Sequence, residues 1–267
     1  MLPDYEMIVH QIPAKDDVKL FPVFDVHYGS QECKEDAFRE FIYNIAKMEN
    51  AFVVLGGDLI DNGTRNGITN VFRATASPSS QKREMAKILE PVRDKVWCGT
   101  CGNHERRSGK DADDDPMYDI MAKLDIENLY RENMAFVKVV LGEQYKGSGV
   151  RTAGDDRPSY MMLVTHGSGG GALPGAVINR NERMGYAVEG IDLLLVGHSH
   201  KPMVSQPGKI VVDTRNNKVS VKPFKVVSAT PWLEYGDYAM QKMLLPSSHC
   251  IQTITLSGRK KEMVVSM

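Results

Sequence analysis

The stretch "LGGDLIDNG", residues 55–63, decides how the rest of the chain is interpreted. It ends an apolar run with Asp58 and Asp61, three positions apart, and glycines flank this acidic pair on both sides. Aspartate and glycine both suit the turn after a strand, because aspartate can bond its own backbone there. Taken alone, the stretch predicts only a turn. The other segments determine whether the two aspartates also have a chemical role.

Five apolar runs along the chain end in polar residues that can bind a metal ion. In order, these segments read "FDVHYG", "GGDLID", "CGNHE", "VTHG" and "VGHSH". They supply Asp25, His27, Asp58, Asp61, Asn103, His104, His166, His198 and His200. A single histidine after a strand is more often structural, but five of the seven histidines of the chain lie in these segments. Because loops at the carboxyl ends of neighbouring strands converge, the pattern predicts one shared metal site.

The order of apolar segments predicts an α/β fold. In the first half, strands at 18–26, 51–58 and 95–105 alternate with helices at 33–50, 77–94 and 115–125. The second half is mostly strands, and Asn216–Asn217 is a plausible hairpin turn. Alternating strands and helices are typical of layered α/β proteins. The length of 267 residues favours one domain over residues 1–267.

The composition is that of an ordinary soluble protein, with 42% hydrophobic and 25% charged residues. The N-terminal residues are partly acidic and lack a basic region followed by an apolar segment, so we expect no secretory signal and a cytoplasmic location. The aliphatic run "IDLLLVG" is too short to cross a bilayer, and we expect no membrane partner. The formal net charge of −1 indicates no overall attraction to nucleic acid, although a local basic groove would not change that sum.

The chain has four cysteines, and two of them form "CGTC" at Cys98 and Cys101. This spacing is found in redox motifs and in half of a zinc site. Since no second pair exists, we favour reduced, partly buried thiols over a redox role.

The five blocks, from Asp25 to His200, resemble the signature of the calcineurin-like metallophosphoesterases, which runs D-x-H, G-D-x-x-D, G-N-H-E/D, H and G-H-x-H. The resemblance covers about two thirds of the chain. It implies a four-layer αββα sandwich of two mixed sheets, in which the strand-rich second half forms the second sheet.

The resemblance also implies a centre with two divalent metal ions. Asp25, His27 and His200 would hold one ion, Asn103, His166 and His198 the other, and Asp58 would bridge them. Carboxylate, imidazole and amide oxygen suit borderline ions, so we expect Mn²⁺, with Fe²⁺, Zn²⁺, Ni²⁺ or Mg²⁺ as alternatives. Two ions about 3.5–4 Å apart can share a hydroxide that attacks phosphorus.

His104 and Asp61 are the predicted catalytic residues. By resemblance, His104 stabilises the transition state or protonates the leaving oxygen, and Asp61 or Glu105 orients its ring. The alternative is that His104 is an ordinary loop residue.

The chain departs from the Ser/Thr protein phosphatases of this family, which read G-D-x-x-D-R-G. Asn62 stands where their phosphate-gripping arginine would be, so a planar bidentate donor is missing and a protein phosphatase is disfavoured. We predict substrate contacts from Asn62 and Arg106, and Arg107 is a further candidate. Both arginines could equally be solvated loop charges.

The predicted function is a metal-dependent phosphodiesterase. "DVHYGS" is similar to the D-x-H-x-G block of repair exonucleases, and the chain also resembles phage members of the family, so a DNA nuclease is one version. The substrate would be a phosphate ester, DNA or a nucleotide, and homodimers occur among such nucleases. The alternatives are a phosphomonoesterase acting on a small molecule or phosphoprotein, and a metal-binding scaffold without catalysis. Trp232, Tyr235 and Tyr238 would stack on a base or pack in the interior.

Overall fold

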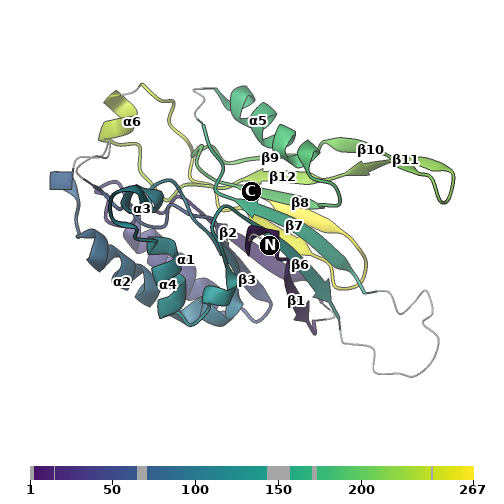
Figure 1. Ribbon diagram of the computed structural model, residues 1–267, viewed down its shortest axis with the longest axis horizontal. Coiled ribbons are helices and arrows are strands. Elements are labelled where there is room, and N and C mark those ends of the chain that lie inside the picture. The colour runs from purple at the N-terminus through teal and green to yellow at the C-terminus, as the bar shows by residue number, and fades with distance from the viewer. Residues whose placement is uncertain (1–2, 15, 65–70, 143–156, 170–172, 242) are drawn as a thin grey trace.

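The computed structural model describes residues 3–14, 16–64, 71–142, 157–169, 173–241 and 243–267, and it contains two six-stranded mixed sheets packed face to face (Figure 1). The first sheet has the order β14 (Met263–Ser266), β13 (Thr253–Leu256), β2 (Val18–Val23), β3 (Ala51–Leu55), β4 (Val96–Thr100) and β5 (Tyr130–Arg131). The second has the order β1 (Ile8–Ile12), β6 (Met134–Leu141), β7 (Ser159–Thr165), β8 (Leu193–Val196), β12 (Lys225–Ser228) and β9 (Met203–Ser205).

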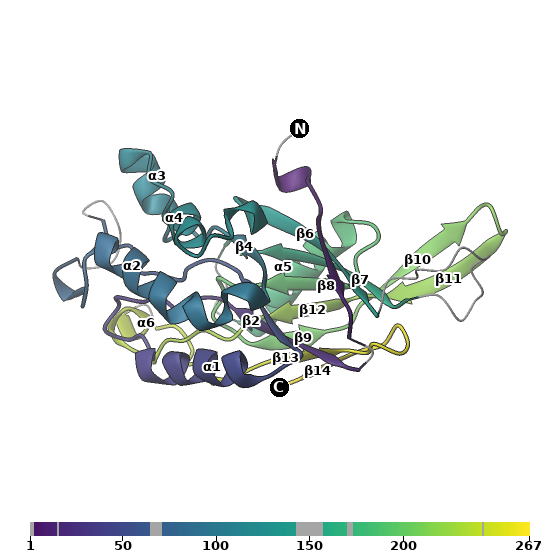
Figure 2. The ribbon, with the colours of Figure 1, turned by 90° about the horizontal axis from the view of Figure 1, so that it is seen from below.

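Helices cover the outer face of each sheet, as Figures 1 and 2 show. On the first sheet lie α1 (Glu35–Lys47), α2 (Pro78–Leu89) and α4 (Pro116–Lys123), and on the second lies α5 (Pro174–Ala187). Two short helices are α3 (Arg106–Ala112) and α6 (Asp237–Gln241), and the 3-10 turns are Pro3–Tyr5, Val71–Arg73, Glu90–Lys95 and Glu127–Leu129. The predicted four-layer αββα sandwich of two mixed sheets is confirmed.

Apolar side chains fill the space between the sheets and between each sheet and its helices. Val18, Leu20 and Trp97 of the first sheet meet Val137 and Leu195 of the second in the central layer. Alternate residues of one strand therefore serve two cores, since successive side chains of a strand point to opposite faces. The central strands β3 and β8 are buried on both faces, which explains their continuous apolar sequences.

The helices form where the sequence indicates them. In α1 the buried residues Phe38, Phe41, Ile42 and Ile45 recur at helical spacing. The Ser77 side chain accepts a hydrogen bond from Ser80 N and caps the start of α2. No helix of the described residues is long and apolar enough to cross a membrane.

The structure refines three predictions made from the sequence, on the Asn216–Asn217 turn, on the three C-terminal aromatic residues and on the end of the strand at 18–26. The Asn216–Asn217 turn joins β10 (Gly208–Asp213) to β11 (Lys218–Pro223), an antiparallel hairpin separate from both sheets. Trp232 is buried against Phe38 and Phe41 and so belongs to the core, while Tyr235 is partly exposed and the Tyr238 side chain lies outside the described residues. The strand predicted at 18–26 is β2, which ends at Val23 because the backbone turns there into the loop that carries Asp25 and His27.

The cysteines of "CGTC" are free thiols in the interior. Cys98 and Cys101 are both buried and unpaired with each other. Burial raises the pKa of both thiols, so they are protonated and unreactive at neutral pH.

Candidate metal centre

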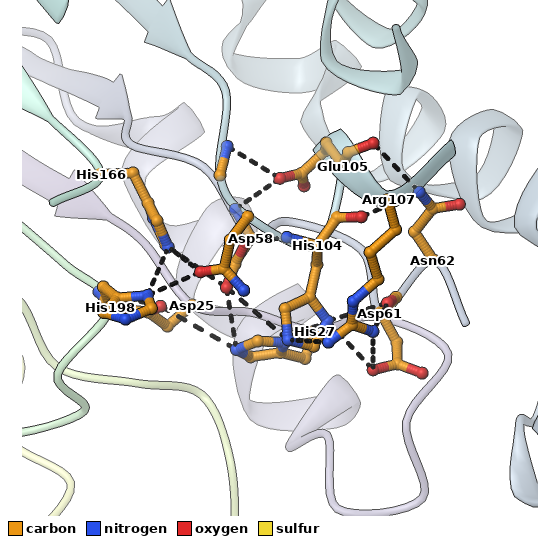
Figure 3. A network of polar contacts seen from close by, with 12 residues as sticks. Asp25, His27, Asp58, Asp61, Asn62, His104, Glu105, Arg107, His166 and His198 are labelled. Atoms are coloured by element: carbon orange, nitrogen blue, oxygen red, sulfur yellow. Dashed lines mark hydrogen bonds and ion pairs between the residues drawn. The ribbon is translucent and has the colours of Figure 1, made fainter. Parts of the chain in front are cut away.

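The nine polar residues of the five blocks come together at one edge of the sandwich (Figure 3). Their loops follow the carboxyl ends of β2, β3 and β4 in the first sheet and of β7 and β8 in the second. Parallel strands end at the same edge of a sheet, so residues far apart in the sequence meet there.

A first cluster is formed by Asp25, His27 and His200. His200 Nε2 lies 3.3 Å from Asp25 Oδ1 and 3.2 Å from His27 Nε2. His27 Nε2 lies 3.9 Å from Asp25 Oδ1. Asp25 and His27 are buried, whereas His200 is partly exposed, so this cluster has one open side.

A second cluster is formed by Asp58, His166 and His198, and Asn103 completes it. His166 Nε2 lies 3.2 Å from Asp58 Oδ2 and 3.0 Å from Asn103 Oδ1. His198 Nδ1 lies 2.6 Å from Asn103 Oδ1 and 3.3 Å from His166 Nε2.

Asp58 stands between the two clusters. Its Oδ2 lies 3.8 Å from His27 Nε2 in the first cluster and 3.2 Å from His166 Nε2 in the second. The imidazoles around it hold the pKa of Asp58 well below its ordinary value despite complete burial, with His104 and His166 as the main contributors. Asp58 is therefore an ionised carboxylate within reach of both groups.

The donor atoms of the second cluster fit a cation. Nδ1 of His166 donates a hydrogen bond to Gly56 O at 2.9 Å, so the lone pair of Nε2 faces the oxygens of Asp58 and Asn103. Atoms that all accept must share a proton or a metal ion. Burial alone would lower the pKa of His166, but the charge and hydrogen bond of Asp58 outweigh it and raise this pKa to about 10. Carboxylate, imidazole and amide oxygen are the donors that borderline divalent ions prefer.

The backbone at these ligands is left-handed. Asp25, His27, Asp58, His198 and His200 have φ between 50° and 64°. Aspartate and histidine adopt this region more readily than most residues, yet each instance costs roughly 1–3 kcal/mol unless the surroundings enforce it. Here they do, since the Asp25 carboxylate accepts the N–H of His198 and Asp25 N donates to Gly57 O.

His104 lies beside the clusters with its ring fixed on both sides. Nδ1 donates to Asp61 O at 2.8 Å and lies 3.3 Å from Asp61 Oδ1, and Nε2 accepts from Arg107 at 2.8 Å. The backbone N–H of His104 also donates a hydrogen bond to Asp58 Oδ1. Burial opposes protonation, but Asp58 and Asp61 outweigh it and raise the pKa of His104.

The profile of the calcineurin-like phosphoesterases matches residues 25–202, which span all five blocks and most of the chain. This chain belongs to the calcineurin-like phosphoesterase family. Members of the family hydrolyse phosphate esters with divalent metals, and this chain brings together aspartates and histidines that could hold a metal ion.

Solved structures of similar fold are distant from this calcineurin-like chain. A predicted phosphoesterase from Streptococcus pneumoniae TIGR4 is 10% identical, with a TM-score of 0.39 over 94% of this chain and 90% of that one. A metallophosphoesterase from Sphaerobacter thermophilus is 14% identical, with a TM-score of 0.39 over 90% and 83%.

The NAD nucleotidase of Haemophilus influenzae is 10% identical, with a TM-score of 0.41 over 94% of this chain and 49% of its own. The calcineurin-like chain thus spans about half the length of that nucleotidase. No curated protein sequence matches the chain at a significant level.

Glu105, the last residue of the "GNHE" block, has a structural position in this calcineurin-like site. Its buried carboxylate accepts the N–H groups of Asp58, Leu59, Ile60 and Gly102 at 2.7–3.2 Å. It makes no contact with the His104 ring, so of the two orienting residues considered from the sequence, the geometry favours Asp61. Glu105 joins the loop after β3 to the loop after β4.

The two predicted substrate contacts lie apart from the metal cluster. Asn62 is fully buried, and its Nδ2 donates to the carbonyls of His104 and Glu105. Arg106 points to the turn before β6 and donates to Glu132 and Asn133. The adjacent Arg107 faces His104 and Asp61 O, so the structure gives Asn62 and Arg106 no support as substrate contacts and draws attention to Arg107.

Proposed function

We propose that this calcineurin-like phosphoesterase is a phosphodiesterase with two divalent ions, of which Mn²⁺ is the best candidate. The observation that carries the proposal is the position of Asp58 between two clusters of ligands. Asp25, His27 and His200 would hold one ion and Asn103, His166 and His198 the other. Ions bound there would activate the attacking water and neutralise charge that develops on the phosphate.

His104 is the proposed proton donor to the leaving oxygen. When the ring is protonated, Asp61 accepts its Nδ1–H, and its Nε2–H, which then no longer accepts from Arg107, faces the substrate. The raised pKa keeps a proton available near neutral pH, as a general acid requires.

Arg107 is the proposed phosphate contact, in place of Arg106 and Asn62. Its guanidinium lies 2.8 Å from His104 Nε2, where a substrate oxygen would accept from it. The arginine that grips phosphate in the Ser/Thr phosphatases has no counterpart at Asn62. This difference favours a diester, including DNA, over a phosphomonoester, which carries one more negative charge.

Hydrolysis of bis(p-nitrophenyl) phosphate, p-nitrophenyl phosphate, and single- and double-stranded DNA with added Mn²⁺ tests the proposal. Asp58→Asn and His104→Ala should both strongly reduce diester hydrolysis, and Asp58→Asn should reduce it more. The pair Arg107→Ala and Arg106→Ala is matched in charge and position, and KM should rise only for Arg107→Ala. Faster monoester hydrolysis would instead establish the phosphomonoesterase, and a metal-loaded protein without turnover would establish the scaffold.

The sequence expectations of a cytoplasmic location, a phage relationship and a homodimer stay predictions.

A further inference from the structure

The β10–β11 hairpin, residues 208–223, exposes apolar side chains that a soluble protein normally covers. Ile210 pairs with Val221 and Val212 with Val219, so all four side chains lie on one face of the ribbon. Their exposed fractions are 76%, 69%, 63% and 64%. Scattered apolar residues are ordinary on surfaces, but a contiguous aliphatic face is typical of an interaction site.

The opposite face and the rim of the hairpin are basic. Lys209 is held at the base, where its ammonium donates to Val188 O and lies over the Phe224 ring. Arg215, Lys218 and Lys222 are exposed. The hairpin thus carries four basic residues and one acidic residue, Asp213, in a chain whose formal net charge is −1. A partner that binds this hairpin must therefore offer both negative charge and an apolar region that the aliphatic side chains can enter.

The hairpin is not part of the phosphoesterase site. Figures 1 and 2 both place it at the end of the molecule away from α3 and α6, whereas α3 begins at Arg106, two residues after His104. A substrate bound at the metal centre would therefore leave the hairpin free to contact something else.

A second copy of the chain fits this hairpin poorly. Two hairpins packed through their aliphatic faces would leave their basic faces pointing outward, without a partner for their charge. Four aliphatic side chains per copy also form a small patch compared with the roughly 1,200–2,000 Å² of a stable interface. Nucleic acid would be recognised by basic and aromatic groups, but the exposed face is aliphatic.

We propose that the β10–β11 hairpin docks on the surface of an anionic lipid bilayer. Ile210, Val212, Val219 and Val221 enter the interface, and Arg215, Lys218 and Lys222 contact lipid headgroups. Stable peripheral binding takes two signals, and an apolar face together with basic residues supplies both. The sequence predicted no membrane partner because its aliphatic runs are too short to span a bilayer, but docking on a bilayer surface needs no spanning segment.

Sedimentation with vesicles tests the proposal. The full chain is mixed with vesicles of phosphatidylcholine alone or with about one third phosphatidylserine. We expect binding to the anionic vesicles at least about tenfold above the neutral ones, weakening as salt is added. Ile210→Ser/Val221→Ser should abolish this binding. Lys218→Ser/Lys222→Ser should weaken it about 25-fold, since each basic residue contributes about fivefold.

Val264→Ser is the control, because Val264 is also an exposed aliphatic residue, at 52%, but lies on β14 outside the hairpin. This variant should bind vesicles like the wild type. Diester hydrolysis and Tm should be unchanged in all the hairpin variants, so the outcome is independent of the proposed enzyme activity.

Three results would overturn the proposal. The first is equal vesicle binding by the wild type and by Ile210→Ser/Val221→Ser, or no binding by either. The second is a dimer in light scattering that this double variant abolishes, which would assign the hairpin to a second copy. The third is binding to DNA but not to vesicles, lost in Lys218→Ser/Lys222→Ser.

Discussion

The metal centre and the β10–β11 hairpin are opposite exceptions to the usual distribution of polar and apolar residues. At the metal centre, Asp25, Asp58 and His166 are buried. On the hairpin, Ile210 and Val221 are exposed. Buried charge and exposed aliphatic surface both cost free energy unless a partner compensates them. The two regions therefore each need a partner. A cation would compensate the buried charge of the metal centre, and an anionic bilayer would cover the aliphatic face of the hairpin.

Removing the charge of Asp58 should have the largest effect on the activity of the metal centre. In Asp58→Asn we expect diester hydrolysis to fall at least about 1,000-fold, because several kcal/mol of transition-state stabilisation depend on the metal centre. Steady-state kinetics and metal content by elemental analysis measure this. Full activity at full metal content would contradict the position assigned to Asp58 between the two clusters.

The next largest effect is expected for His104→Ala. Loss of a positioned proton donor should lower kcat about 100-fold. Metal content should stay that of the wild type, since the ligand atoms of both clusters come from other residues. Glu132→Ala, which removes the side-chain ion pair of Glu132 with Arg106 outside the clusters, is the control and should leave kcat unchanged.

Glu105→Gln tests whether the buried carboxylate of Glu105 holds the loop after β3 and the loop after β4 together at the metal centre. The substitution replaces one acceptor oxygen by an NH₂ group facing backbone N–H donors, which should cost roughly 1–3 kcal/mol of unfolding free energy. Chemical denaturation measures the change. An unaltered free energy of unfolding would show that the two loops are held together by other contacts.

The affinity for metal should rise with pH. The pKa of His166 is raised from 6.5 to about 10, so without metal its imidazole is protonated at neutral pH and the ion must displace that proton. Affinity should change by up to about tenfold per pH unit below 10. Calorimetry in buffers of different ionisation enthalpy should detect proton release at pH 7.5, and His166→Gln should reduce it.

The same shift has a defined sign for stability without metal. The folded-state pKa of His166 lies above its ordinary 6.5, so protonated His166 adds to the free energy of unfolding. This contribution is fully present below pH 6.5 and is lost as the pH rises through about 10.

The hairpin should give the smallest effect on stability. In Ile210→Ser the side chain loses little burial, so the free energy of unfolding should change by less than about 0.5 kcal/mol. Leu194→Ala, at a buried position of β8, should cost about 2–5 kcal/mol by the same denaturation experiment. A large loss in Ile210→Ser would mean that the hairpin stabilises the fold directly.

The sequence predicted the layers and the five blocks because both depend on local signals. Apolar runs and helical spacing are visible over a few residues, and each metal ligand follows a strand. The helix α5 was missed because its buried residues include Asn181 and Gly185, which do not form an apolar stripe. The helix α3 was missed because "RRSGKDA" is short and polar.

The details of the site depended on directions that the sequence does not carry. Neighbouring residues of a helix point about 100° apart, so Arg106 and Arg107 face different surroundings, and the motif could not indicate which one faces His104. Three of the four backbone N–H groups that Glu105 accepts come from a loop more than forty residues earlier, and no residue type marks them.

The arrangement of the strands has a consequence for how the protein is made. Asp25 O accepts the N–H of Trp232, and β12 completes the second sheet beside β8, the strand before His198. A nascent chain can therefore form β2 and β3 early but cannot close the loop of Asp25 until residues 225–232 have been synthesised. The metal centre is therefore completed only late in synthesis, although its first ligands are among the first residues of the chain to be made.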